Sequence, residues 1–129
     1  LSMVLLDVDN FKQLNDHYGH LTGDQVLKHL VDTISANLRP NDIVARLGGE
    51  EFVLLLPATP AEAAAQLTER LQRQLTRAYF MADQDRLVIT FSAGVTVWKQ
   101  GEDEVDTIER SDQAMYRAKL AGKNRVEVA

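Results

Sequence analysis

Residues 43–56 read IVARLGGEEFVLLL, which places two short apolar segments on either side of GGEE at 48–51. Apolar segments of strand length joined by a turn that contains two glycines are typical of a β-hairpin. Because these glycines carry no side chain, a flat ring or a ribose can approach the backbone closely, and a merely tight turn explains them equally well. We therefore predict strands at 43–47 and 52–56, with acidic residues at or beside the turn.

Helical and strand patterns alternate on both sides of this hairpin, which favours an α/β or α+β domain. Met3 to Leu6 form a continuous apolar run, as expected for a central strand covered on both faces. We therefore expect a five-stranded mixed central sheet flanked by helices. In chain order, the predicted elements are a strand at 3–6, a short helix or turn at 10–18, a helix at 24–38, the hairpin at 43–56, a helix that starts around Pro60, a strand at 87–97, a helix at 104–121 and an edge strand at 126–128.

The composition is that of a folded, acidic domain. The 129 residues are 45% apolar and 26% charged, which suits one domain with its own hydrophobic core, and the formal net charge is -5. An acidic surface binds nucleic-acid backbone poorly, so we expect no nucleic-acid partner. The absence of cysteine excludes disulfides, thiolate zinc sites and cysteine nucleophiles, and it suits the cytoplasm. No apolar run reaches membrane-spanning length, so we expect no membrane contact by this domain.

Acidic residues follow the predicted central strand directly, as Asp7-Val8-Asp9. The end of such a strand is the usual site edge of an α/β sheet, and if the hairpin pairs beside it, Asp7 and Glu50 converge. Carboxylates held together repel unless hard cations bind between them, and Mg²⁺ typically uses one or two carboxylates plus substrate phosphates. Two such ions can clamp a phosphoryl group during in-line attack. A second interpretation stays open, in which Asp7 and Asp9 cap the next helix. In that case Glu50 and Glu51 are solvated turn residues.

Residues 46–52, RLGGEEF, resemble the signature that names the GGDEF family of diguanylate cyclases, in its GGEEF form. The resemblance implies a nucleotidyltransferase that condenses two GTP into cyclic di-GMP and releases two pyrophosphates. It also implies a fold like the palm of nucleotide polymerases and cyclases. Further matches occur in the family's order and spacing: DVDNFK at 7–12, NDHYGH at 15–20, GD at 23–24, SAGV at 92–95, AMYRAK at 114–119 and GKNR at 122–125.

The resemblance implies roles for the acidic residues and a metal cofactor. Asp7 and Glu50 would hold two Mg²⁺ or Mn²⁺ ions per active site, with help from the backbone carbonyl of Val8. Glu50 would also lie close to the 3′-hydroxyl that must lose its proton, and Glu51 would act as a supporting acid. Catalysis is therefore expected from Glu50 and Glu51.

The resemblance also implies a GTP site. Asn15 and Asp24 would read the guanine edge, because a carboxylate can accept hydrogen bonds from guanine N1–H and N2–H₂, a donor pair that adenine lacks. Without the family, an Asx turn and a helix N-cap explain these two residues. Without the family, the favourable interaction of cations with a helix C-terminus likewise explains Lys119 and Lys123. The remaining implied GTP contacts are Asn10, Phe11 and Lys12 around the phosphates at a helix N-terminus, Gly48 and Gly49 in the hairpin turn, and Lys119 and Lys123 at the β- and γ-phosphates.

A regulatory site is implied by Arg39-Pro40-Asn41-Asp42, which has the RxxD form and the family's spacing before the hairpin turn. It resembles the inhibitory site at which cyclic di-GMP binds, and Arg70 would contribute to the same site. An arginine suits this role because its planar fork grips phosphate and guanine in a bidentate manner. A surface ion pair between Arg39 and Asp42 is the alternative.

The family's single-GTP sites imply that turnover needs a homodimer. The chain begins inside a predicted strand and lacks the DxLTxLxNR segment usual in the family, so we expect residues 1–129 to be one GGDEF domain from an N-terminally truncated longer protein. That parent is expected to carry a sensory or dimerising domain, with or without a membrane anchor. Two other functions remain: an inactive module that binds GTP or cyclic di-GMP, and a cyclase with another product, which would need a different residue at Asp24.

Overall fold

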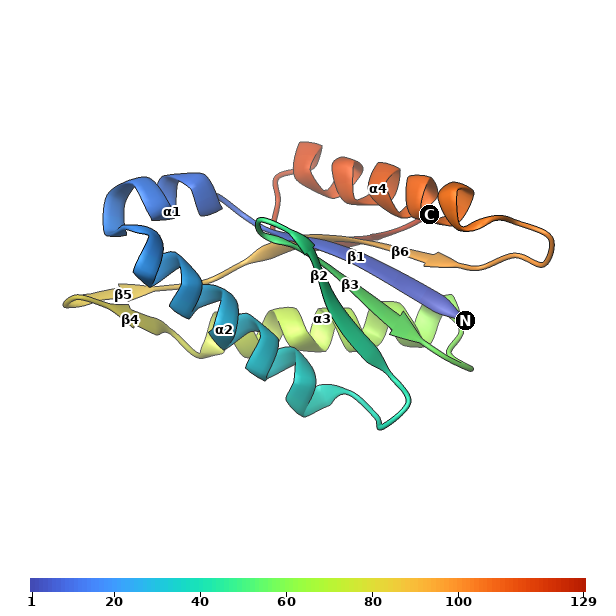
Figure 1. Cartoon of the computed structure of the whole chain (residues 1–129), viewed down its shortest axis with the longest axis horizontal. Helices are drawn as coiled ribbons and strands as arrows, with labels where there is room; N and C mark the ends of the chain where they lie inside the picture. The colour runs from blue at the N-terminus through green and yellow to red at the C-terminus, as the bar shows by residue number, and fades with distance from the viewer.

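Five strands form one central sheet, with four helices and a separate two-stranded ribbon around it (Figure 1). The structure is a computed structural model and describes residues 1–129. The strands are β1 (Ser2–Val8), β2 (Ile43–Gly48), β3 (Glu51–Leu56), β4 (Phe80–Ala82), β5 (Asp85–Leu87), β6 (Phe91–Val97) and β7 (Arg125–Val128). The helices are α1 (Phe11–Tyr18), α2 (His20–Asn37), α3 (Ala61–Arg77) and α4 (Glu104–Leu120).

The strand order in the sheet is β2-β3-β1-β6-β7, so β1 is the central strand. It pairs antiparallel with both β3 and β6, whereas β7 lies parallel to β6 at the edge. The predicted five-stranded mixed sheet and the β2–β3 hairpin are confirmed. The hairpin pairs beside the first strand, which was the condition for Asp7 and Glu50 to converge. Asp7 at the end of β1 is paired with Glu51 on one side and Ser92 on the other.

The side chains of β1 alternate between two faces of the sheet. Val4, Leu6 and Val8 are buried in the main core together with apolar residues of α2, α3, β3 and β6. The opposite face, which carries Leu5 and Asp7, lies against α4 (Figure 1). Full burial of each aliphatic side chain contributes about 1.5–3 kcal/mol, so the core fixes β1 and with it the place of Asp7.

Helix α4 lies directly on β6 because the strand carries a glycine at the crossing. A Cβ atom at Gly94 would stand 2.2 Å from the carbonyl oxygen of Ser111 and 2.5 Å from the backbone nitrogen of Met115. Nearby, the hydroxyls of Thr96 and Ser111 share a buried hydrogen bond of 2.6 Å. This close packing carries Lys119, near the end of the helix, to the end of β1.

Two predicted boundaries are wrong. The helix expected from residue 24 begins at His20, because Gly19 adopts a positive φ of 90° and redirects the chain right after α1. The strand expected at 87–97 is broken: Leu87 ends β5, which pairs with β4, and β6 begins at Phe91. The predicted helix at 104–121 and edge strand at 126–128 are confirmed within one residue at each end. None of the helices has the length and apolar character needed to span a membrane.

Candidate active site

The acidic residues meet where β1 ends beside the hairpin turn. The backbone N–H of Val8 donates to the carbonyl oxygen of Glu50 at 3.2 Å, which holds the turn alongside the end of β1. Glu51 lies directly opposite Asp7 in the β1–β3 pairing, so the two side chains share one face of the sheet. The predicted convergence of the first strand's acids with the hairpin's acids therefore occurs in the structure.

Burial and mutual repulsion act on these carboxylates. Burial raises the pKa of Asp7, and the charges of Glu50 and Asp9 raise it further against the lowering effect of Lys119. The pKa of Glu51 is also raised, first by burial and then by the charge of Asp7. Such a cluster favours a bound cation, since positive charge stabilises the ionised acids.

Lys119 supplies one positive charge to the cluster. Its Nζ donates to Oδ2 of Asp7 at 2.5 Å, and the Asp7 side chain is only 8% exposed. Burial lowers the pKa of Lys119, but the hydrogen bond to Asp7 and the charges of Glu51 and Glu50 outweigh it, and the net shift is upward. Lys119 is thus held charged inside the site. The helix C-terminus alone does not explain its position, because Asp7 binds its ammonium group.

The N-terminus of α1 forms the other wall of this site. Asn10 precedes the helix in the left-handed conformation, with φ 58°, and no side chain caps the first turn. The interpretation in which Asp7 and Asp9 cap this helix is therefore wrong. Lys123 reaches across and donates to Oδ1 of Asn10 at 2.7 Å. A cavity of about 160 Å³ lies among these groups, lined by Asp7, Val8, Asp9, Asn10, Phe11, Lys12, Gln13, Glu50, Lys119 and Lys123.

The donor set at this edge fits a hard divalent cation. Asp7 and Glu50 offer carboxylate oxygens, and Val8 between Asp7 and Asp9 offers a carbonyl oxygen. No group of three or more acidic or histidine side chains is arranged as a complete metal site. Two protein carboxylates with further oxygens from a phosphate ligand are the usual coordination of Mg²⁺.

The two predicted guanine-reading residues lie inside helices, Asn15 in α1 and Asp24 in α2. Their interpretation as an Asx turn and a helix N-cap is therefore wrong. Oδ1 of Asn15 is buried without a hydrogen-bond partner, and it packs against Gly23, where a Cβ atom would stand 1.8 Å from it. A glycine at this point of α2 is what allows the Asn15 side chain its position.

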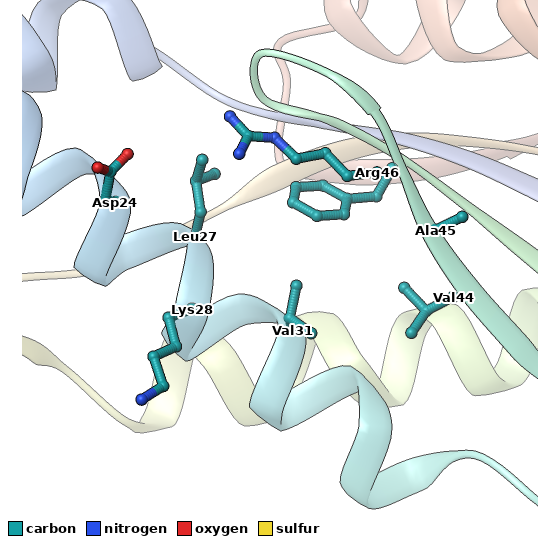
Figure 2. A pocket seen from close by; sticks show the side chains of 8 residues that line it. Asp24, Leu27, Lys28, Val31, Val44, Ala45 and Arg46 are labelled. Atoms are coloured by element: carbon teal, nitrogen blue, oxygen red, sulfur yellow. The ribbon is translucent and has the colours of Figure 1, made fainter.

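A cavity of about 480 Å³ separates α2 from β2 (Figure 2). Asp24 stands at one end, aliphatic side chains such as Leu27 and Val31 form the α2 wall, and Val44 lines the β2 wall. Figure 2 shows the side chain of Arg46 extending from β2 across the cavity toward α2, and its Nε donates to the carbonyl oxygen of Gly49 at 2.8 Å. No role was predicted for Arg46, although the hairpin signature contains it two residues before the glycines.

The predicted inhibitory residues gather elsewhere, around a cavity of about 370 Å³ lined by Arg39, Asp42 and Arg70. Arg39 makes the ion pair with Asp42, at 3.3 Å, and also donates to the hydroxyl of Thr59 at 2.5 Å. Arg70 donates to Oδ1 of Asn37 at 3.4 Å. The alternative of a surface ion pair is thus present in the structure, but its two partners also border a cavity together with a second arginine.

Paired carboxylates at a sheet edge, a helix N-terminus and two lysines around one cavity are features of enzymes that transfer phosphoryl or nucleotidyl groups with the help of divalent cations. The sequence matches the family described as "Diguanylate cyclase, GGDEF domain" over residues 1–125. The chain therefore belongs to the GGDEF family, whose diguanylate cyclases are nucleotidyltransferases that generally depend on metal ions.

Relatives with known names support this assignment. Diguanylate cyclase DgcP from Pseudomonas aeruginosa is 49% identical over 129 residues, which are 100% of this chain and 19% of that protein. Diguanylate cyclase A from Treponema denticola is 38% identical over 130 residues and is covered to 35%. The chain thus spans about a fifth to a third of the length of these curated relatives.

Solved structures share the fold. The GGDEF domain of DgcB from Caulobacter crescentus in complex with c-di-GMP has a TM-score of 0.93 and 35% identity, covering 98% of this chain and 76% of that one. The active GGEEF domain of a diguanylate cyclase from Vibrio cholerae has a TM-score of 0.86 and 32% identity, covering 98% of this chain and 81% of that one.

Proposed function

We propose that this chain is a GGEEF-type diguanylate cyclase domain, which condenses two GTP into cyclic di-GMP and releases two pyrophosphates. One observation carries the proposal: Asp7, Glu50, Lys119 and Lys123 surround one cavity at the N-terminus of α1. The names of the relatives and the active GGEEF domain among the structural neighbours support it. A module that only binds GTP would need the lysines for its phosphates, and the paired acids beside them favour catalysis with metal ions.

Residues at the end of β1 would hold the metal ions. Two Mg²⁺ or Mn²⁺ ions bound by Asp7, Glu50 and the Val8 carbonyl would neutralise the phosphates and activate the attacking 3′-hydroxyl. Glu50, in the turn beside Asp7, would lie near that hydroxyl as its proton leaves. Glu51 would act from the same sheet face as Asp7, and its raised pKa suits a group that holds or passes a proton.

The remaining residues would bind and orient GTP. Asp24 and Asn15 would accept and donate hydrogen bonds at the guanine edge, with the base beside the cavity between α2 and β2. The turn at Gly48 and Gly49 leaves room for the nucleotide, since a Cβ atom at either glycine would meet nothing within 4 Å. Backbone N–H groups of the first turn of α1, from Asn10 through Phe11 and Lys12, would face the phosphates. Lys119 and Lys123 would neutralise the β- and γ-phosphates.

The reaction joins two nucleotides, and the proposed site holds one. We therefore propose that two copies face each other during turnover, and that residues 1–129 act as one GGDEF domain of a longer, cytoplasmic protein with a sensory or dimerising part. Among the structural neighbours, DgcB was solved with a coiled coil, and SiaD with its activator SiaC. Catalysis would consist mainly of positioning and charge neutralisation.

The proposed reaction is tested by incubating concentrated protein with GTP and Mg²⁺ and separating the products by chromatography. We expect cyclic di-GMP and pyrophosphate in a ratio of one to two. If the isolated chain makes none, the assay is repeated with a coiled coil fused to its N-terminus, which forces two copies together. A forced dimer that binds GTP and forms no product would overturn the cyclase proposal in favour of an inactive binding module.

Gly23→Ala is expected to weaken GTP binding, because the new Cβ atom would displace the Asn15 side chain. A displaced Asn15 would lose its hydrogen bond to guanine, which contributes about 0.5–1.5 kcal/mol, so GTP affinity should fall by up to about tenfold. Isothermal titration calorimetry with GTP measures the change. The control is Gln25→Ala, at an exposed position of the same helix. Unchanged GTP affinity in the Gly23 variant would contradict the proposed role of Asn15.

We also propose that cyclic di-GMP inhibits the enzyme through Arg39, Asp42 and Arg70. The cavity that they border, with two guanidinium groups beside it, supports this role. Arg70→Ala is expected to raise the concentration of cyclic di-GMP that halves activity about tenfold, since charge-assisted hydrogen bonds contribute about 1.5–3 kcal/mol. Activity without added product should be unchanged. If cyclic di-GMP inhibits the wild type and Arg70→Ala equally, the product binds at another site.

A further inference from the structure

Asp9 joins three segments that are far apart in the sequence. Its Oδ2 accepts hydrogen bonds from the hydroxyl of Thr90 at 2.8 Å and from the backbone N–H of Asn124 at 2.9 Å. Its Oδ1 accepts one from the hydroxyl of Ser92 at 2.6 Å. In addition, the backbone N–H of Asp9 donates to the carbonyl oxygen of Thr90 at 2.9 Å. Both oxygens of the carboxylate are thus engaged within the protein, although Asp9 lines the same cavity as Asp7.

The bond to Asn124 reaches a turn with an unusual backbone. Lys123 and Asn124 both have positive φ, 64° and 48°, a conformation that side-chain-bearing residues rarely adopt. Such conformations persist where surrounding contacts hold them, and lysine adopts this one less readily than asparagine does. At the α4 end of the turn, the N–H of Lys123 donates to the carbonyl oxygen of Ala118 at 3.0 Å. At the β7 end, the N–H of Asn124 donates to Asp9.

The shape of this turn decides where Lys123 points. With the turn in place, Nζ of Lys123 reaches Oδ1 of Asn10 at the start of α1. Asp9 and Asn10 are neighbours in the chain. Asp9 binds the backbone of the turn, and Asn10 contacts the side chain of Lys123. A carboxylate suits position 9, because both of its oxygens can accept: the N–H of Asn124 can only donate, and the hydroxyls of Thr90 and Ser92 donate here.

We propose that Asp9 is a positioning residue for phosphate binding: it locks the α4–β7 turn so that Lys123 faces the N-terminus of α1. This inference rests on the proposed function, in which Lys123 neutralises the terminal phosphates of GTP. Asp9 would not bind the metal ions or the nucleotide itself. Its effect would be confined to the phosphates that Lys123 reaches, while guanine recognition in the cavity between α2 and β2 stays intact.

Asp9→Asn tests this, because a neutral amide oxygen is a weaker acceptor than the carboxylate for the N–H of Asn124, and the amide offers only one such oxygen where the carboxylate offers two. Affinities for GMP, GDP and GTP are measured by isothermal titration calorimetry in the wild type, Asp9→Asn and Thr90→Val. Thr90→Val is the matched control, since it removes one donor and leaves the bond between Asp9 and Asn124. We expect Asp9→Asn to bind GMP within about twofold of the wild type and GTP about tenfold more weakly. Thr90→Val should bind all three nucleotides much as the wild type does.

A double-mutant cycle with Lys123→Ala then identifies the route of the effect. If Asp9 acts through Lys123, the double variant binds GTP no more weakly than Lys123→Ala alone. Equal weakening of GMP, GDP and GTP by Asp9→Asn would show a merely structural role and overturn the proposal, as would additive losses in the cycle.

Two further outcomes separate this inference from the function on which it rests. A wild type that binds GTP no more tightly than GMP has no terminal-phosphate site, and the proposed function and the role of Asp9 then fall together. In the other outcome, the affinity of the wild type rises from GMP to GDP to GTP, and the affinity of Asp9→Asn rises by the same factors. That result overturns only the role of Asp9. If Asp9→Asn does not fold, Asp9→Glu replaces it, with the same selective loss expected because its longer side chain displaces the carboxylate.

Discussion

Glu50→Ala and Asp7→Asn are each expected to abolish cyclic di-GMP formation in a protein that still folds. Both residues stand where the end of β1 meets the hairpin turn, and together they provide the carboxylate oxygens of the proposed metal site. Loss of one group that stabilises developing charge typically lowers turnover by a factor on the order of 10²–10³. Since both ions would share these two side chains, we expect a loss at the upper end of that range for either variant.

The fold should survive both substitutions for different reasons. Glu50 contributes its backbone carbonyl, not its side chain, to the bond that holds the turn beside Val8, and alanine keeps that carbonyl. Asparagine nearly matches aspartate in shape, and removing a buried carboxylate whose pKa is raised also removes its desolvation cost. Circular dichroism and thermal unfolding check the fold, and chromatography of the reaction products measures turnover.

The control for both variants is Glu109→Ala, which removes an equal charge from an exposed position of α4. It should keep wild-type activity, because Glu109 does not line the cavity at the end of β1. Normal activity in a folded Glu50→Ala or Asp7→Asn protein would contradict the metal assignment directly. A loss of activity in Glu109→Ala would show instead that turnover responds to net charge and not to the ligands themselves.

The architecture was predictable where the sequence pattern is local. The apolar run at Met3 to Leu6 and the two glycines at 48–49 each determine their own element, because strand burial and turn geometry act over a few residues. Whether the hairpin lies beside β1 stayed open, because that pairing joins segments that are far apart in the chain. The break between β5 and β6 was not predictable, because residues such as Thr90 continue an apolar alternation. Asp9, from the other end of the chain, holds Thr90 at that point.

The site residues also divide into those that a local sequence pattern indicates and those whose role depends on contacts in the folded chain. Asp7, Glu50 and the glycine turn carry a signal in their own spacing, and the resemblance to GGDEF proteins extends it to Asn15, Asp24 and the lysines. Gly23 and Asp9 act only through contacts that the fold creates. Gly23 matters because α1 folds back against α2 and sets Asn15 on it, and no periodicity in the sequence encodes that approach. Asp9 resembles a second metal ligand in sequence, whereas its hydrogen bonds assign it to the turn after α4.

Lys119→Met is expected to change the binding of nucleotide and of metal ion in opposite directions. Its ammonium holds Oδ2 of Asp7 at 2.5 Å, which is an oxygen that a cation at this site would need. Without the lysine, the cluster of Asp7, Glu50 and Glu51 loses its internal positive charge. We therefore expect the affinity for Mn²⁺ alone to rise roughly tenfold, a change of about 1.4 kcal/mol. Electron paramagnetic resonance of free Mn²⁺, recorded without nucleotide, measures this directly.

GTP affinity should fall in the same variant, because Lys119 is proposed to leave Asp7 for a phosphate once the nucleotide and ions arrive. The loss of a charged hydrogen bond costs about 1.5–3 kcal/mol, which corresponds to a ten- to hundredfold weaker GTP complex. Lys123→Met is the matched control: its ammonium contacts the neutral amide of Asn10 and not an acid. It should weaken GTP binding with little gain in Mn²⁺ affinity. If Lys119→Met binds Mn²⁺ no more tightly than the wild type, Asp7 is not a metal ligand, whatever its effect on turnover. If Mn²⁺ affinity rises equally in both lysine variants, the gain reflects overall charge and not an exchange of partners at Asp7.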